Sequence, residues 1–220
     1  IQTMATAAEH RERILQSFVD FRASAVALGA SGNREYILTS EHDPGMAGRL
    51  ANTLVMNGIE VEKALEPVNV GGRTLAAEGT YIVPMDQPAH RLIRNLLDPH
   101  TPMDPMFVER QLERRANRLR DQIYDVTAWS MPSLWDVELI VSERATGAAT
   151  VSLNNTRHLS DVAQLPETVV GYLMPWGTNA AAAVAELLRE GIRVRSAGGE
   201  FSLDGRDFGV GTAIIRNSDN

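Results

Sequence analysis

The sequence has no cysteine and few aromatic residues, and each scarcity excludes a class of protein. Without cysteine, this chain of 220 residues has no disulfide, no thiolate nucleophile and no cysteine-ligated zinc or iron–sulfur cluster. Aromatic residues make up 5% of the chain, too few to suggest a platform on which nucleic-acid bases stack. No apolar run reaches the ~20 residues that span a bilayer, so no membrane partner is expected.

The charge and composition indicate an ordinary globular protein. The formal net charge of −7 argues against a nucleic-acid partner, because binding to nucleic acid depends on neutralising phosphates. A hydrophobic content of 44% and a charged content of 22% fit one large domain or two small ones. The chain begins with Ile1, not Met, and shows no signal peptide, so we expect a segment of a longer protein.

An internal repeat is the strongest organising signal. A short apolar run precedes a helix in each copy, each helix ends at a glycine, a hairpin turn follows, and a second strand begins at another glycine. The spacing between the two glycines is 79 − 58 = 21 residues in one copy and 211 − 191 = 20 in the other. The matching pairs are Tyr36–Leu38 with Tyr172–Met174, Gly58 with Gly191, Gly72-Arg73 with Gly205-Arg206, and Gly79–Val83 with Gly211–Ile215.

The repeat predicts an α/β fold. Strand-helix-strand crossovers predict a sheet with parallel pairs flanked by helices, built from two similar strand-helix-strand-hairpin units. Residues 1–33 are expected to form a linker helix from a preceding domain. Residues 34–143 form the first unit with a helical extension, and residues 144–220 the second unit, truncated at its C-terminus. We place no element within 144–166.

Two helices carry apolar stripes in the sequence. The first helix is expected over residues 6–28, with a stripe at Ile14, Phe18, Phe21, Ala25 and Leu28. The second is expected over residues 106–123, with a buried stripe at Leu112, Ala116, Leu119 and Ile123.

The loops at the carboxyl ends of the first strand of each unit are the candidate ligand-binding site. In open sheets of this kind, ligands favour such loops. The candidate residues are Glu41, His42 and Asp43 in the first unit and Trp176, Thr178 and Asn179 in the second. Asp43 has a simpler alternative role, because it precedes Pro44 and fits the N-cap of a helix.

No catalytic, cofactor-binding or metal-ligating residue is predicted. His158 precedes Asp161 by three residues in a polar region, which is a weak pattern for a metal site. The sequence has no Gly-x-Ser-x-Gly elbow and no phosphate-binding loop, since Lys63 is the only lysine and follows a strand.

One region resembles a known family. The resemblance is to the region that follows the catalytic domain in large bacterial zinc carboxypeptidase-like metallopeptidases of the carboxypeptidase A superfamily, and it covers about residues 6–216. Tyr-Asp-Val-Thr-Ala-Trp is its most specific element. The residues that carry the resemblance are Gly58–Val61, Gly79–Pro84, Asp86–Pro88, Leu96–Pro99 and Tyr124–Pro132.

The resemblance implies a multidomain bacterial hydrolase that removes residues from peptide C-termini. Zinc is expected in the catalytic domain of that parent, not in this segment, because no His here has Glu three positions later. The implied partners are that catalytic domain and a following domain that resembles class I glutamine amidotransferases. The implied location is periplasmic or extracellular.

Two functions remain open at this stage. The chain is either a non-catalytic accessory region of such a metallopeptidase or a module that binds a small ligand with the loops named above. An accessory region should expose an apolar patch where the catalytic domain docks.

Overall fold

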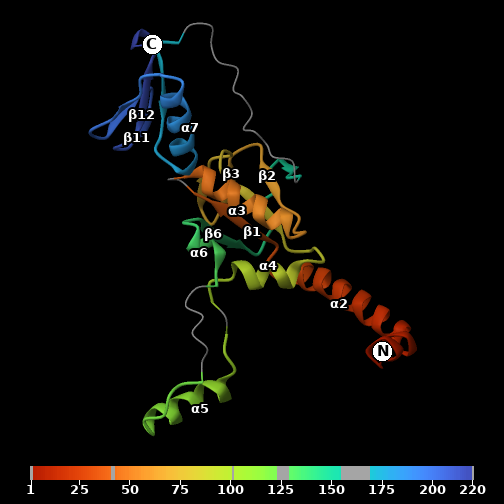
Figure 1. Cartoon of the computed structure of the whole chain (residues 1–220). Helices are drawn as coiled ribbons and strands as arrows, with labels where there is room; N and C mark the ends of the chain where they lie inside the picture. The colour runs from red at the N-terminus through yellow and green to blue at the C-terminus, as the bar shows by residue number, and fades with distance from the viewer. Residues whose placement is uncertain (1, 41–42, 101, 123–128, 155–168, 220) are drawn as a thin grey trace.

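The computed structural model describes residues 2–40, 43–100, 102–122, 129–154 and 169–219. Two α/β units follow a pair of helices, α1 (Gln2–Glu9) and α2 (Arg11–Ser31), as Figure 1 shows. Among the described residues, the first unit contains a five-stranded sheet and the second a three-stranded sheet.

The first unit begins with the repeated set of elements and adds two strands to it. The repeated set is β1 (Glu35–Thr39), α3 (Pro44–Met56), β2 (Glu62–Ala64), the hairpin of β3 (Val68–Val70) and β4 (Arg73–Leu75), and β5 (Tyr81–Pro84). There follow α4 (His90–Leu97), α5 (Pro105–Ala116), α6 (Met131–Leu134), β6 (Glu138–Ser142) and β7 (Thr150–Ser152). The strand order is β6-β1-β5-β2-β7, so the first sheet continues to residue 152, within a stretch where the sequence indicated no element.

The second unit repeats the core of the first. It contains β8 (Gly171–Met174), α7 (Thr178–Arg189), β9 (Arg195–Ser196), the hairpin of β10 (Phe201–Leu203) and β11 (Arg206–Phe208), β12 (Ala213–Arg216) and the 3-10 turn η1 (Asn217–Asp219). The strand order β8-β12-β9 corresponds to β1-β5-β2 of the first unit. In both units, therefore, the last strand of the repeat lies between the two strands that the helix connects.

The prediction of parallel strand pairs is wrong. Every strand pair among the described residues is antiparallel. The strands joined by each helix do run in the same direction, but they are not neighbours, because β5 separates β1 from β2 and β12 separates β9 from β8. A crossover that skips one strand leaves room for a returning strand, which pairs antiparallel on both sides.

The helices of the repeat end in the same way. After α3, Gly58 has φ of +76°, its N–H donates to the Val55 carbonyl, and the Ile59 N–H donates to the Leu54 carbonyl. After α7, Gly191 has φ of +77°, and it and Ile192 make the equivalent bonds to Leu188 and Leu187. This is the Schellman arrangement, in which a left-handed glycine satisfies the last carbonyls of the helix. The predicted strand Ile59–Val61 is displaced, and β2 begins at Glu62.

The core lies in the first unit. On one face of the five-stranded sheet, α3, α4 and α6 cover Tyr36, Leu38 and Val83. On the other face the β3–β4 hairpin covers Ile37 and Ile82. The second unit is packed less tightly, since Tyr172 is 37% exposed whereas the equivalent Tyr36 is 2% exposed.

Most residues of the two predicted helical stripes are exposed, although burial was predicted for the second stripe, whose Ile123 lies outside the described residues. The helix expected over residues 6–28 is broken at His10 and continues to Ser31, and of its stripe only Ala25 is buried. The helix expected over residues 106–123 ends at Ala116. Leu112, Ala116 and Leu119 are exposed, whereas Gln111 is buried and accepts a hydrogen bond from the Gln122 N–H at 2.7 Å. Figure 1 shows why: α5 stands away from the sheet, so no core faces it.

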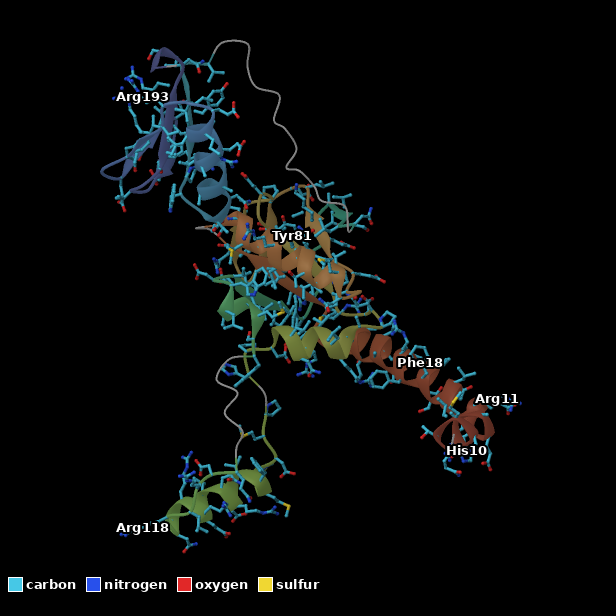
Figure 2. All side chains as sticks on the ribbon, in the orientation of Figure 1. His10, Arg11, Phe18, Tyr81, Arg118 and Arg193 are labelled. Carbon is cyan, nitrogen blue, oxygen red and sulfur yellow. The ribbon has the colours of Figure 1, made fainter. Side chains whose placement is uncertain are left out.

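The C-terminal part of α2 is anchored to the first unit by a close backbone approach. At Gly29, an added Cβ would lie 1.8 Å from the Met85 carbonyl oxygen. Arg91 of α4 adds a second anchor, because its guanidinium donates to the Phe21 carbonyl oxygen at 2.7 Å and to the Ser24 hydroxyl at 3.1 Å. The N-terminal part of α2 extends beyond the sheet, as Figure 2 shows for Phe18.

Replacing Gly29 by alanine should separate α2 from the first unit. The methyl group would clash with backbone that cannot move aside, so we expect Gly29→Ala to lower the free energy of unfolding by about 2 kcal/mol. Urea unfolding followed by circular dichroism measures the change. Gly199→Ala is the control, because a Cβ at Gly199 meets no atom within 4 Å. Equal stability of the two variants would contradict the close approach.

Candidate functional site

The N-termini of α3 and α7 meet at the side chain of Asp43. Asp43 follows β1 and caps α3, and its Oδ1 accepts a hydrogen bond from the Gly45 N–H at 3.1 Å. Its Oδ2 accepts a second bond from the Thr178 N–H of α7 at 2.6 Å and a third from the Thr178 hydroxyl. One carboxylate therefore binds the first turns of two helices that belong to different units.

The electrostatics of this contact favour a charged Asp43. Burial alone would raise the pKa of Asp43, but hydrogen bonds from the Thr178 hydroxyl and from the backbone of Thr178, Gly45 and Met46 outweigh it and lower the pKa. The positive ends of both helix dipoles point toward the same carboxylate, which stabilises the negative charge further. Asp43 thus supplies the anion that two helix N-termini would otherwise attract from solution.

Two glycines allow the units to approach this closely. A Cβ on Gly45 would lie 2.6 Å from the Asn179 Nδ2, and a Cβ on Gly177 would lie 2.9 Å from the Asp43 Oδ1. Neither glycine was singled out from the sequence, although each stands at the start of a helix, where a close approach to another helix end requires a small residue.

The structure brings together only part of the predicted ligand site. The Asp43 carboxylate accepts a hydrogen bond from the Thr178 N–H, and the Asn179 amide lies beside Gly45. Trp176 lies next to Gly211 of its own unit and is 54% exposed. Glu41 and His42 lie outside the described residues. Asp43 therefore serves as the N-cap that the sequence left open as an alternative, and its carboxylate also bridges to α7.

Removing the charge of Asp43 should weaken the link between the units. An asparagine keeps one acceptor but turns an amide NH₂ toward N–H donors, so we expect Asp43→Asn to lower the free energy of unfolding by about 2 kcal/mol at neutral pH. The folded-state pKa lies below the ordinary 3.8, so this stability is present above pH 3.8 and is lost as pH falls through the folded-state pKa. Urea unfolding at several pH values measures both effects.

Asp104→Asn is the matched control for that experiment. Asp104 caps α5 through the Met106 N–H at 2.8 Å, and no bond to a second helix is among its described contacts. Asp104→Asn should lower the free energy of unfolding less than Asp43→Asn does. A loss equal to that of Asp43→Asn, or a difference from wild type that persists in acid, would contradict the bridging role of Asp43.

A second polar cluster, which the sequence did not indicate, lies at the end of α4. The Tyr36 hydroxyl donates to the Asp98 Oδ1, and the Arg94 Nε donates to the Asp98 Oδ2 at 2.9 Å. Burial raises the pKa of Tyr36 to about 12, and the hydrogen bond and charge of Asp98 act in the same direction. The cluster borders a pocket of about 310 Å³ lined by Arg91, Arg94, Asn95, Asp98, His100 and Pro102.

The ionisation of Tyr36 should be visible in alkaline titration. Since its pKa is about 12 in the folded state and 10.0 ordinarily, its contribution to stability is full below pH 10.0 and is lost as pH rises through about 12. In Tyr36→Phe, the absorbance step of tyrosinate near pH 12 should lose the amplitude of one tyrosine. A step unchanged in Tyr36→Phe would contradict the assignment.

The described part of the chain contains no group of three or more His, Asp or Glu side chains placed to hold a metal ion. His158 and Asp161, the weak metal pattern in the sequence, lie outside the described residues. Within those same residues, no helix combines the length and the apolar character needed to cross a membrane.

An apolar pocket of about 310 Å³ lies in the second unit, between α7 and the three-stranded sheet. The sequence pointed to one of its residues, Trp176, but for a different site. The sequence pointed to Gly211 and Ala213 only as part of the repeat and did not indicate the other lining residues as a site. These others are Val184, Leu188, Val194, Arg195 and Ser196.

Comparison with known proteins identifies no relative of this chain: no family model, no curated protein and no solved structure matches it.

Proposed function

We propose that the chain is a non-catalytic accessory region of a zinc carboxypeptidase-like metallopeptidase, and that α2 packs against the catalytic domain of that protein. The observation that carries the proposal is the exposed apolar stripe of α2. The sequence resemblance at Gly79–Pro84, Asp86–Pro88 and Leu96–Pro99 supports the choice of partner. Zinc belongs to the catalytic domain in this proposal, and the location is periplasmic or extracellular.

The stripe lies along one face of the helix and is exposed except at Ala25, which is buried. Ile14, Phe18 and Phe21 are 50%, 58% and 54% exposed, and Leu28 on the same face is 49% exposed. Residues spaced by three and four positions lie on one face of a helix, so these side chains form a single apolar surface. A contiguous apolar surface of this kind marks an interaction site in a folded protein.

The anchoring of α2 suits a docking role. Gly29 and Arg91 fix its C-terminal part to the first unit, and the Arg91 guanidinium also lies 4.3 Å from the centre of the Phe21 ring. The N-terminal part extends from that anchor with Ile14 and Phe18 exposed (Figure 2). Because one end of the helix is fixed to the first unit, the exposed apolar side chains of the other end keep a fixed orientation relative to that unit. The ordering entropy that a docking helix would lose on binding is therefore already reduced.

Polar substitutions in the stripe should weaken binding to the catalytic domain. The proposal predicts that the gene encodes a zinc carboxypeptidase-like domain before Ile1. That domain, produced separately, should bind the chain, and Ile14→Ser with Phe18→Ser should reduce the affinity by at least about tenfold, as for two central apolar contacts. Phe21 is left in place because its ring packs against Arg91 of the first unit. Isothermal titration calorimetry measures the affinity.

Leu203→Ser is the matched control, because Leu203 is equally exposed at 50% but lies in the β10–β11 hairpin. The control should bind like the wild type, and the thermal unfolding temperature of the double variant should be unchanged. A gene without such a domain, a wild-type chain that does not bind it, or a double variant that binds as well as the wild type would overturn the proposal.

A further inference from the structure

The central strands of the two units differ in one aromatic side chain, because Tyr81 of the first unit corresponds to Ala213 of the second. In the first sheet, Tyr81 lies opposite Leu38 of β1 and Lys63 of β2. In the second sheet, Ala213 lies opposite Met174 of β8 and Ser196 of β9, the strands equivalent to β1 and β2. Tyr81 and Ala213 each come two residues after a glycine with positive φ, so the register is the same.

In the first unit, the Tyr81 ring fills the space between the helix and the sheet. Its ring packs against the core below α3, and its hydroxyl lies 2.9 Å from the position that a Cβ on Gly48 would take. Burial raises the pKa of Tyr81, as expected for a phenol partly removed from water. Figure 2 places Tyr81 on the first unit, at the level of α3.

In the second unit, the alanine leaves this space empty. The pocket of about 310 Å³ lies against Ala213, with Val184 and Leu188 of α7 and Val194 of the strand side as its other walls. Ser196, which also lines the pocket, lies opposite Ala213 in the sheet, as Lys63 lies opposite Tyr81 in the first unit. The pocket of the second unit thus adjoins the position that carries an aromatic ring in the first unit.

The chemistry of the pocket suits an aromatic ring. Its walls are aliphatic, and Trp176 at its edge offers an indole face on which a second ring can stack with an offset. Arg195 and Ser196 add a polar edge. The volume is at the lower end of the roughly 300–1,000 Å³ typical of small-molecule pockets, which fits one ring better than a peptide or a helix.

We propose that the second unit binds a small aromatic molecule, with a ring the size of a tyrosine side chain, in the pocket between α7 and Ala213. The ring lies against Ala213, the residue that corresponds to Tyr81 of the first unit. This site is separate from the stripe of α2 and does not depend on the accessory role proposed above.

The test uses p-cresol, which is the tyrosine side chain without its backbone. Titration of p-cresol into the full chain, followed by the methyl resonances of Val184, Leu188 and Ala213, should give saturable shifts with a Kd on the order of 1 mM, as expected for a ligand of this size. Ala213→Tyr should fill the pocket from within and abolish the shifts of the valine and leucine methyl groups. Ala182→Tyr, at an exposed position of α7, is the control and should bind like the wild type.

Amide spectra verify that Ala213→Tyr is folded, and Ala213→Leu repeats the test with a smaller side chain that should weaken binding. No saturable shift in the wild type, or equal binding by the wild type and a folded Ala213 variant, would overturn the proposal. It would also be overturned if the same methyl resonances shifted with protein concentration in the absence of p-cresol, because the pocket would then be covered by a second copy of the chain.

Discussion

The position of the returning strand governs the architecture of both units. β5 lies between β1 and β2, and β12 lies between β8 and β9, so each connecting helix crosses over a strand that is added later in the chain. The central strand forms backbone hydrogen bonds on both sides and leaves no free edge. In the second unit it is also the most buried strand of the repeat, whereas in the first unit β1, which pairs with β5 and β6, is buried over more of its length. The central strand also carries the residue that faces the helix, Tyr81 in one unit and Ala213 in the other.

The same backbone supports two different degrees of packing. In the first unit, β6 extends the sheet beyond β1, and α4 and α6 cover the face that carries Tyr36 and Leu38. In the described part of the second unit, β8 pairs with β12 alone, and Tyr172 and Met174 are more exposed than their equivalents. The added strand and helices cover the first unit, whereas the described part of the second unit has no such cover. Only the second unit therefore leaves the face between its helix and its sheet accessible to a ligand.

Local signals in the sequence predicted much of the fold, whereas the neighbours of each strand could not be predicted. Asp43-Pro44 and Asn57-Gly58 mark the ends of α3 because capping depends on residues within one turn. The repeat follows from matched glycines. Strand order depends instead on which edges remain unpaired after the whole unit has folded, and no residue of β1 or β2 encodes that β5 will separate them. The prediction that Leu112 is buried was also wrong, because an amphipathic pattern indicates a helix but does not show whether a hydrophobic core faces it.

The candidate site shows the same limit of local information. The sequence indicated Asp43 as a candidate ligand residue or a helix cap, and Thr178 and Asn179 as candidate ligand residues of a second loop. The hydrogen bond between Asp43 and Thr178 joins residues 135 positions apart, and no local pattern predicts it. A loop that stands free could present Asp43 to a ligand. Here the helix dipoles of α3 and α7 converge on the carboxylate and the two glycines leave it no excess space, so the charge is satisfied within the protein. The two helix N-termini therefore connect the units through Asp43 instead of binding an anion from solution. The ligand that we propose binds elsewhere, in the pocket of the second unit beside Ala213.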